Sequence, residues 1–281
     1  RAWFYYLHIL STAIMGTPAF KNVIVNGIVL AEDGKKMSKK LKNYPDPNEV
    51  LERYGADALR LYLASSPVMH AESLNFSEVG VREVYNKVVN SLANVLEFYE
   101  MYGGNSTEKN SALSSIHVLD TWILARLQQV VGEVTHEMNA YRSAEAARPL
   151  FDSVSDLSPW YVRRSRKRFW KSEDDTDKND AYRTLHYVLL KLAVILAPFT
   201  PFLAEELYQK LGGGQESVHL LDWPRNDSVD ELVLSEMATV REYVNQALSL
   251  RAKEAIKIRQ PLARVTVPTL GRFVNFVDIL T

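Results

Sequence analysis

The chain has 281 residues, 47% of them hydrophobic, a formal net charge of −1 and no cysteine. This length and hydrophobic content suffice for a sizeable core and predict two domains. The near-zero net charge excludes nucleic-acid binding through a global positive field, so RNA contacts would need local basic patches. The lack of cysteine excludes disulfides and thiolate metal sites and fits a reducing compartment.

Neither a metal site nor a membrane span is expected. The six histidines show no spacing suited to a metal, such as two on one helical turn. The apolar run 188–197 contains Lys191 and is broken by Pro198, so it is too short to cross a bilayer. The chain opens at Arg1 without an initiator Met or a signal peptide, which suggests a piece of a longer protein.

The opening of the chain predicts a helix followed by strands. Apolar residues recur at steps of three and four over 3–14, which is typical of a helix ending near Gly16. The β-branched runs 23–25 and 28–30, separated by Asn26-Gly27, predict two short strands or a strand with a sharp turn. This order is expected of the closing part of a doubly wound α/β nucleotide domain.

A polar loop rich in lysine follows at 34–40. Its opening glycine gives backbone freedom, Ser38 offers a short hydroxyl, and Lys36 and Lys39 lie three residues apart. Ammonium groups on such a loop can bind polyphosphate oxygens, while Met37 packs beneath the nucleotide. The alternative is a solvated lysine-rich turn, which is the commoner fate of a cationic cluster.

Two short helices are predicted after the loop. Asp46 is a good N-cap with proline at the first helical position, and this helix is expected to end at Gly55. A second helix is expected over 56–64. Asp57 and Arg60 are predicted to form a local ion pair, which contributes little if exposed.

The remainder of the chain is predicted to be helical. Apolar stripes at helical spacing predict helices over 81–99, 119–134, 144–170, 185–196, 201–212 and 237–251. Pro149 and Pro159 are expected to kink or break the third helix, and Thr200-Pro201 to cap the fifth. Such stripes bury against each other, so an antiparallel helical bundle is predicted. Alternation over 264–267 suggests a strand that begins a further module.

The segment 163–168 carries five cations in six residues. On a helix, Arg163 and Lys167 share one edge and Arg164 and Arg168 the next. Like charges held together repel unless an anion meets them, and guanidinium groups suit phosphate geometry. The alternative is a solvated helix face balanced by the acids that follow. The neighbouring Trp160 and Tyr161 would either stack on bases or anchor the helix, and burial is favoured for Trp160.

Lys36, Met37, Ser38 and Lys39 resemble the Lys-Met-Ser-Lys-Ser signature of class I aminoacyl-tRNA synthetases, with Lys40 in place of the closing serine. The resemblance continues through Asn26–Leu30, Asn43–Pro47, Tyr54–Arg60, Trp160–Arg163, Leu196–Phe202, His219–Pro224 and Arg259–Leu262, and so covers nearly the whole chain. This order looks like the isoleucine branch, particularly its eukaryotic cytosolic form, which some bacteria share. Valyl and leucyl relatives share the loop but less of the Trp160 segment.

The resemblance implies a mostly α chain. Its start would be the remnant of a doubly wound α/β nucleotide-binding domain with the KMSKS-type loop, followed by an antiparallel helical-bundle anticodon-binding domain. The implied domains are 1–76, the C-terminal part of the catalytic domain with its connecting helices; 77–262, the anticodon-binding domain; and 263–281, the start of a truncated downstream module.

By the same resemblance, the parent enzyme joins isoleucine to ATP with Mg²⁺ and passes the acyl group to tRNA(Ile) in the cytoplasm. Lys36 and Lys39 would be catalytic and would stabilise the charge that moves onto pyrophosphate, on a loop that closes after ATP binds. The ATP contacts implied are Lys36, Met37, Ser38 and Lys39. The RNA contacts implied, against the anticodon arm, are Arg163, Arg164, Lys167 and Arg168.

The family's other signature, His-Ile-Gly-His, is absent, and His8-Ile9-Leu10-Ser11 only begins like it. The isoleucine pocket and the editing domain would lie upstream of Arg1. The chain alone is therefore expected neither to activate isoleucine nor to charge tRNA. Rival interpretations are a non-catalytic RNA-binding helical protein and a structural helical scaffold. Whether the parent sits in a larger synthetase assembly stays open.

Overall fold

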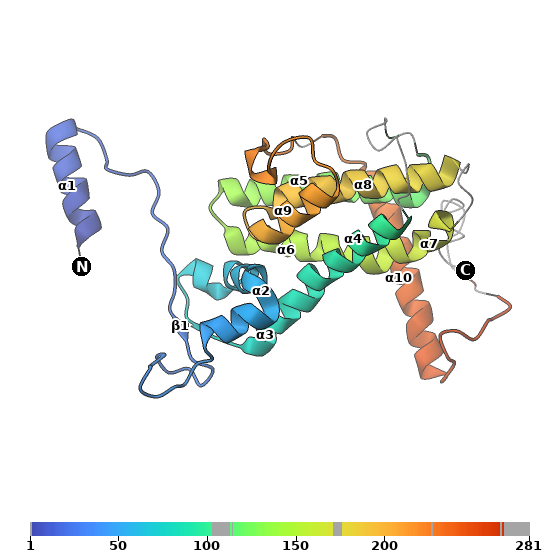
Figure 1. Cartoon of the computed structure of the whole chain (residues 1–281), viewed down its shortest axis with the longest axis horizontal. Coiled ribbons are helices and arrows are strands. Elements are labelled where there is room, and N and C mark those ends of the chain that lie inside the picture. Colours follow the sequence, from blue (N-terminus) through green and yellow to red (C-terminus); the bar gives the residue numbers. More distant parts are fainter. Residues whose placement is uncertain are drawn as a thin grey trace. The chain divides into compact units, whose positions relative to one another are not determined.

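The computed structural model describes residues 2–102, 113, 115–170, 176–225, 227–264 and 266. It divides into two compact units. We call residues 1–44 with 66–76 the lysine-loop unit, and residues 45–65 with 77–281 the helical unit. Figure 1 labels helices α1 to α10 and strand β1.

The described residues of the lysine-loop unit form one α-helix, one 3-10 helix and a small parallel sheet. Its elements are α1 (Trp3–Met15), β1 (Val29–Leu30), the 3-10 helix η1 (Pro67–His70) and β2 (Leu74–Asn75). β1 pairs with β2 so that Val29 lies opposite Leu74. The predicted helix at 3–14 is confirmed and is followed by Gly16 in the left-handed region. α1 buries none of its residues.

The predicted strand at 23–25 is wrong, because only the second of the two β-branched runs forms a strand. A strand needs a hydrogen-bonded neighbour, and intrinsic β preference alone does not supply one. The segment that pairs with β1 begins to bond to this part of the chain only at Gly27. The Gly27 N–H donates to the Val68 carbonyl at 2.7 Å. A Cβ on Gly27 would lie 1.7 Å from the Glu72 carbonyl oxygen, so this close approach requires glycine.

The helical unit is built from helices in chain order. They are α2 (Pro47–Ala64), α3 (Glu78–Val84), the π-helical turn η2 (Tyr85–Asn90), α4 (Ser91–Tyr102), α5 (Val118–Asn139), α6 (Ser143–Ser155), the π-helical turn η3 (Asp156–Val162), α7 (Arg163–Phe169), α8 (Thr176–Leu196), α9 (Pro201–Lys210), the 3-10 helix η4 (Val218–Leu220) and α10 (Glu231–Lys253). The chain is therefore mostly helical, as predicted. The helix passes Pro149 inside α6, and Pro159 lies in the wide turn η3. The predicted strand at 264–267 lies partly outside the described residues.

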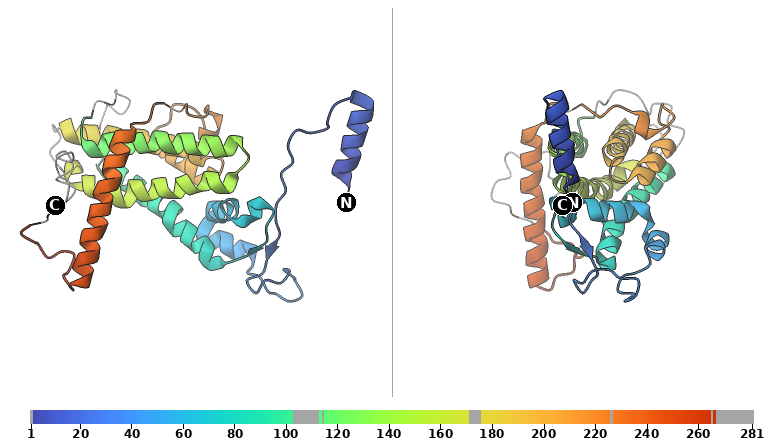
Figure 2. Two further views of the ribbon diagram at one scale, coloured as in Figure 1. Left: turned by 180° about the vertical axis from the view of Figure 1, so that it is seen from behind. Right: turned by 90° about the vertical axis from the view of Figure 1, so that its left-hand side faces the viewer.

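The core of the helical unit lies around α5, which packs against α6, α8 and α10. A three-residue turn joins α5 to α6, so these two helices run antiparallel, and Figure 2 shows α10 running across α5. Leu150, Leu185 and Leu189 are fully buried. Burying each such side chain contributes about 1.5–3 kcal/mol. α10 buries only residues of its first half, namely Val233, Met237 and Val240.

Asp57 and Arg60 bind the ends of two other helices instead of forming the predicted local ion pair. The buried Asp57 carboxylate accepts the Leu203 N–H at 2.6 Å and so caps α9, where Thr200 makes no side-chain cap. Arg60 donates to the Pro198 carbonyl just beyond α8, at 3.3 Å. The unpaired backbone groups at helix ends explain both choices. Burial raises the pKa of Asp57, against the lowering effect of the bond from Leu203.

Candidate functional site

The lysine loop (residues 32–43) leaves β1 through a tight turn. The Ala31 N–H donates to the Lys35 carbonyl at 2.8 Å, and the Gly34 N–H donates to the Ala31 carbonyl at 2.9 Å. Gly34 has a φ of +76°, a conformation that favours glycine. Leu30 and Lys36 then form an antiparallel bridge. The first half of the loop is therefore aligned along the edge of β1.

The side chain of Asn43 closes the second half of the loop. Its Oδ1 accepts the Ser38 N–H at 2.9 Å, and its Nδ2 donates to the Lys36 carbonyl at 3.2 Å. The Ser38 carbonyl accepts the N–H groups of Leu41 and Lys42 at 3.1 and 3.0 Å. Lys42 has a φ of +46°, which is uncommon for a residue other than glycine. Sequence reasoning missed the role of Asn43; the asparagine soon after the lysines was the available signal.

The ammonium groups predicted to bind ATP are accessible to a ligand. Lys36 and Lys39 are exposed, whereas Met37 and Ser38 are half-buried. Lys35 pairs with Asp33 at 3.1 Å, and the hydrogen bond from the Lys35 backbone lowers the pKa of Asp33. Among the described residues, no carboxylate lies within ion-pair distance of Lys36 or Lys39. Both charges are therefore available to an anion.

Arg168, predicted to contact RNA, lies in the core of the helical unit. Its guanidinium makes two hydrogen bonds to the fully buried Asp120, at 2.8 and 2.7 Å, and a third to Asp177 at 2.8 Å. Burial by itself would lower the pKa of Arg168, but the bonds to Asp120 outweigh it and the pKa is raised. Tyr161 is also fully buried and donates to Asp120 at 2.7 Å. Arg168 and Tyr161 therefore anchor α7 and are not placed to meet RNA.

The other cations of α7 are nearer the surface. Arg163 and Lys167 are exposed on one edge, as the spacing predicted. Arg164 is half-buried, with its guanidinium carbon 4.0 Å from the ring centroid of Trp160. Burial lowers the pKa of Arg164. Trp160 is half-buried, and its indole N–H lies 3.3 Å from the Met237 sulfur, so Trp160 joins α7 to α10.

Sequence reasoning did not identify a second buried acid, Asp156 in η3. Its carboxylate accepts the Arg126 Nε–H at 2.8 Å and also pairs with Arg241. The Arg241 guanidinium carbon lies 4.9 Å from the Trp160 ring centroid. Asp156 therefore joins α5, η3 and α10. Its neighbours Asp152, Ser153 and Ser155 are polar too, so no signal in the sequence marked it.

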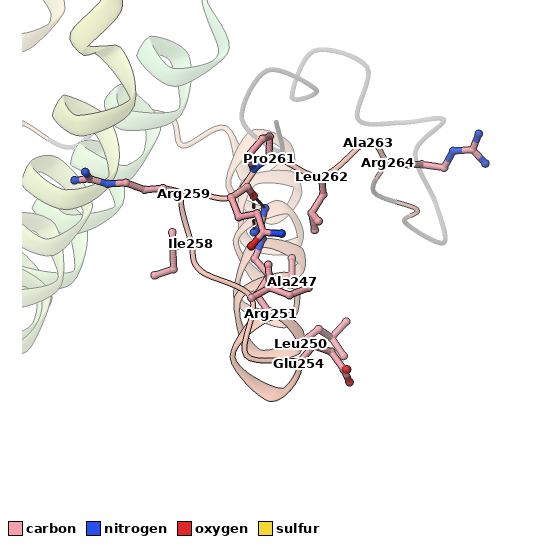
Figure 3. A pocket seen from close by; sticks show the side chains of 12 residues that line it. Ala247, Leu250, Arg251, Glu254, Ile258, Arg259, Pro261, Leu262, Ala263 and Arg264 are labelled. Atoms are coloured by element: carbon pink, nitrogen blue, oxygen red, sulfur yellow. Dashed lines mark hydrogen bonds between the residues drawn. The ribbon is translucent and has the colours of Figure 1, made fainter.

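Two cavities of the helical unit are lined by residues other than the predicted ATP and RNA contacts. One, of about 560 Å³, lies between the last turns of α10 and the returning segment 256–264 (Figure 3). There both terminal nitrogens of Arg251 donate to the Gln260 carbonyl at 2.9 Å. The other, of about 390 Å³, lies between α5, α8 and residues 222–225 with 227. The Trp223 indole N–H fixes that segment by donating to Thr135 at 2.7 Å.

The described part of the chain shows neither a metal-ligand cluster nor a helix suited to a bilayer. Its residues contain no group of three histidine or acidic side chains that could hold a metal ion. None of the described helices is both long enough and apolar enough to span a membrane.

Comparison with known proteins matches both parts of the chain. Residues 120–267 match the anticodon-binding domain of tRNA ligase, and residues 1–75 match tRNA synthetases of class I (I, L, M and V). The chain is 46% identical over 277 residues to the isoleucine–tRNA ligases of Chlamydia trachomatis serovar D and Chlamydia muridarum. It covers 26% of each of them, so it spans about a quarter of their length, and each match covers 95% of this chain. These bacterial relatives do not support the eukaryotic cytosolic form.

A solved structure shares the fold. It is the ternary complex of Agrobacterium radiobacter K84 agnB2 LeuRS, tRNA and LeuAMS, with a TM-score of 0.57 and 21% identity. The likeness covers 82% of this chain and 27% of that chain. The anticodon-binding family matches more than half of the chain, and the class I family precedes it. The chain therefore belongs to the family of tRNA ligase anticodon-binding domains and carries a class I tRNA synthetase segment at its start.

Proposed function

We propose that the chain is a segment of an isoleucine–tRNA ligase that supplies the ATP-phosphate loop and a helical domain for the anticodon arm of tRNA(Ile). The observation that carries this is 46% identity over 277 residues to isoleucine–tRNA ligases, because it extends over both units. The solved leucyl complex shares only 21% identity with this chain. That likeness supports the fold of this chain, and it does not support leucine as the substrate. That the parent is the form of isoleucine–tRNA ligase typical of the eukaryotic cytosol, which some bacteria share, stays a prediction. We propose a cytoplasmic parent, as the resemblance implies.

We further propose domain boundaries at 1–76, 77–262 and 263–281. The matches at 1–75 and 120–267 support the first two domains. Residues 45–65 pack with the helical unit, so the connecting helices join the first domain in sequence and the second in packing.

In the proposed reaction, a carboxylate oxygen of isoleucine attacks the α-phosphorus of ATP and the bond to pyrophosphate breaks. Negative charge then moves onto the leaving pyrophosphate. The exposed ammonium groups of Lys36 and Lys39 would attract that charge most strongly as it develops. Because Asn43 already binds the Ser38 N–H, Ser38 is left to contribute its hydroxyl. Met37 would pack beneath the nucleotide.

Magnesium fits this proposal as a companion of ATP. Mg²⁺ keeps several waters and binds chiefly through substrate phosphates and one or two carboxylates. The described residues offer no three-ligand group of their own. The part of this chain would then be to place Lys36 and Lys39 beside phosphates that the ion also neutralises.

For tRNA, we propose contacts from Arg163, Arg164 and Lys167. Arg163 and Lys167 are exposed, and Arg164 is half-buried, whereas Arg168 is held by Asp120. Each phosphate that Lys167 neutralises adds roughly 0.7–0.9 to the salt slope of binding. Replacing Lys167 by alanine should reduce that slope. Replacing Arg168 by lysine should lower the stability of the fold more than it changes the salt slope.

The decisive experiment is ATP–pyrophosphate exchange by the full-length ligase that contains this chain. Lys39→Ala should lower the exchange rate by roughly 10²–10³-fold, since removal of a comparable charge-stabilising donor costs about 3–4 kcal/mol. Lys35→Ala is the matched control, because Lys35 already pairs with Asp33, and it should stay near the wild-type rate. A near-normal rate for Lys39→Ala would remove Lys39 from the reaction.

A further inference from the structure

The backbone of the lysine loop is paired along both edges. Carbonyl groups alternate in direction along an extended chain, so the Lys35 and Lys36 carbonyls point to opposite sides. The Lys35 carbonyl accepts from Ala31 next to β1. The Lys36 carbonyl and the Ser38 N–H face the other way, and the amide of Asn43 binds both. One side chain thus takes the place that a neighbouring strand would occupy.

Asn43 also closes a ring that presents the lysines. The Ser38 N–H is bound by Asn43, and the Ser38 carbonyl is bound by Leu41 and Lys42. Both backbone groups of Ser38 are therefore used within residues 38–43. Lys39 lies in this closed turn, and Lys36 lies two residues before its first residue, Ser38.

We propose that Asn43 is a positioning residue for ATP activation: it holds the lysine loop in the shape that sets Lys36 and Lys39 against the phosphates. This inference rests on the proposed function of the loop. The primary amide suits the task because it offers a donor and an acceptor in one plane, as a peptide group does. Alanine offers neither group, and aspartate keeps only the acceptor.

The first arm of the test measures amide hydrogen exchange at Ser38 in the full-length ligase. Asn43→Ala removes the Oδ1 acceptor and should speed exchange of the Ser38 N–H by about tenfold, the effect of one lost hydrogen bond. Asn43→Asp keeps that acceptor and should retain most of the protection. Asn22→Ala, at an exposed asparagine of the same unit, is the control and should leave the rate unchanged. Unchanged exchange in Asn43→Ala would overturn the proposal.

The second arm measures ATP–pyrophosphate exchange with the same variants. A positioning role predicts that Asn43→Ala lowers kcat by about tenfold. The KM for isoleucine and the melting temperature should stay at wild-type values, which a general loss of structure would not allow. Faster Ser38 exchange with an unchanged kcat would show that Asn43 shapes the loop without serving the reaction, and would also overturn the proposal.

The two ideas fail in distinguishable ways. If Lys39→Ala retains full activity, the proposed function of the loop fails, whatever Asn43 does. If Lys39→Ala loses activity and Asn43→Ala does not, the loop binds phosphate without help from Asn43. Loss of activity in both, with faster Ser38 exchange in Asn43→Ala alone, supports the positioning role.

Discussion

The helical unit and the lysine-loop unit are held in shape by different forces. Buried side chains such as Leu150 and Leu185 fill the helical unit, and buried acids join its helices. In the lysine-loop unit, α1 buries none of its residues, and Ile14 is 80% exposed. The sheet and loop there are ordered by backbone bonds and by Asn43. The helical unit is therefore held mainly by buried side chains, whereas the lysine loop is held by a few hydrogen bonds.

The largest effect is expected where charge is buried in the helical unit. Arg168→Ala would leave the Asp120 carboxylate buried without its cation, which typically costs about 3–5 kcal/mol. Lys167→Ala, one residue earlier and exposed, should change the free energy of unfolding by less than about 0.5 kcal/mol. Urea unfolding followed by helical circular dichroism measures both. Equal effects would contradict the placement of Arg168 in the core.

Leucines of the two units should respond differently to truncation. Leu185→Ala would open a cavity in the core and is expected to cost about 2–5 kcal/mol. Leu10→Ala in α1, where the side chain is 57% exposed, should cost less than about 0.5 kcal/mol. The same urea titration compares them, and a large loss for Leu10→Ala would erase the contrast between the units.

Within the lysine-loop unit, the sharpest steric constraint is at Gly27. In Gly27→Ala the added carbon would clash with the Glu72 carbonyl oxygen, so the backbone must move. This movement should lower the free energy of unfolding by about 1–3 kcal/mol. Faster exchange of the Leu74 N–H, which donates to Ile28, would report the loss of the sheet. Gly214→Ala is the control, because a Cβ added there would meet no other atom within 4 Å. Unchanged exchange in Gly27→Ala would show that the approach is not tight.

The smallest effect expected is a gain in the stability of the closed lysine loop. Lys42 holds a φ of +46°, and the left-handed region costs a residue with Cβ about 1–2 kcal/mol. Lys42→Gly should therefore stabilise the closed loop by up to about 1 kcal/mol and slow exchange of the residue 42 N–H. Lys40→Gly, at a position without positive φ, should instead speed that exchange. The reverse order would argue against the closed turn at 38–43.

The helices could be predicted because their signal is local. Apolar spacing over 119–134 and 185–196 located α5 and α8, and the N-cap at Asp46 with the break at Gly55 described α2. The spacing repeats within each turn of helix, so no knowledge of distant residues was needed. A kink or break was expected at Pro159, and the wide turn η3 lies there, but its π-helical form was not foreseen.

The strands and the ion pairs depend on distant residues, and here sequence reasoning failed. The run 23–25 had the composition of a strand but no partner, whereas β2 is only two residues long and leaves little trace in the sequence. Asp57 accepts a hydrogen bond at the start of α9, from a residue 146 positions away, and does not form the predicted ion pair with Arg60. Of the cations in 163–168, only the fold shows which one reaches Asp120.

The wide turn η3 fixes which face of α7 points inward. In a regular helix each residue advances the chain by about 100°, and a π turn accommodates additional residues without carrying that rotation forward. Loss of Ser158 or Pro159 would thus be absorbed as regular helix, with both flanks in phase and with Asp156 and Tyr161 kept. Loss of one residue from α7 ahead of Arg168 would instead rotate the following cations by about 100° and separate Arg168 from Asp120. Natural variation in length should accordingly be tolerated at Ser158 and Pro159 and selected against in the six residues that follow the turn.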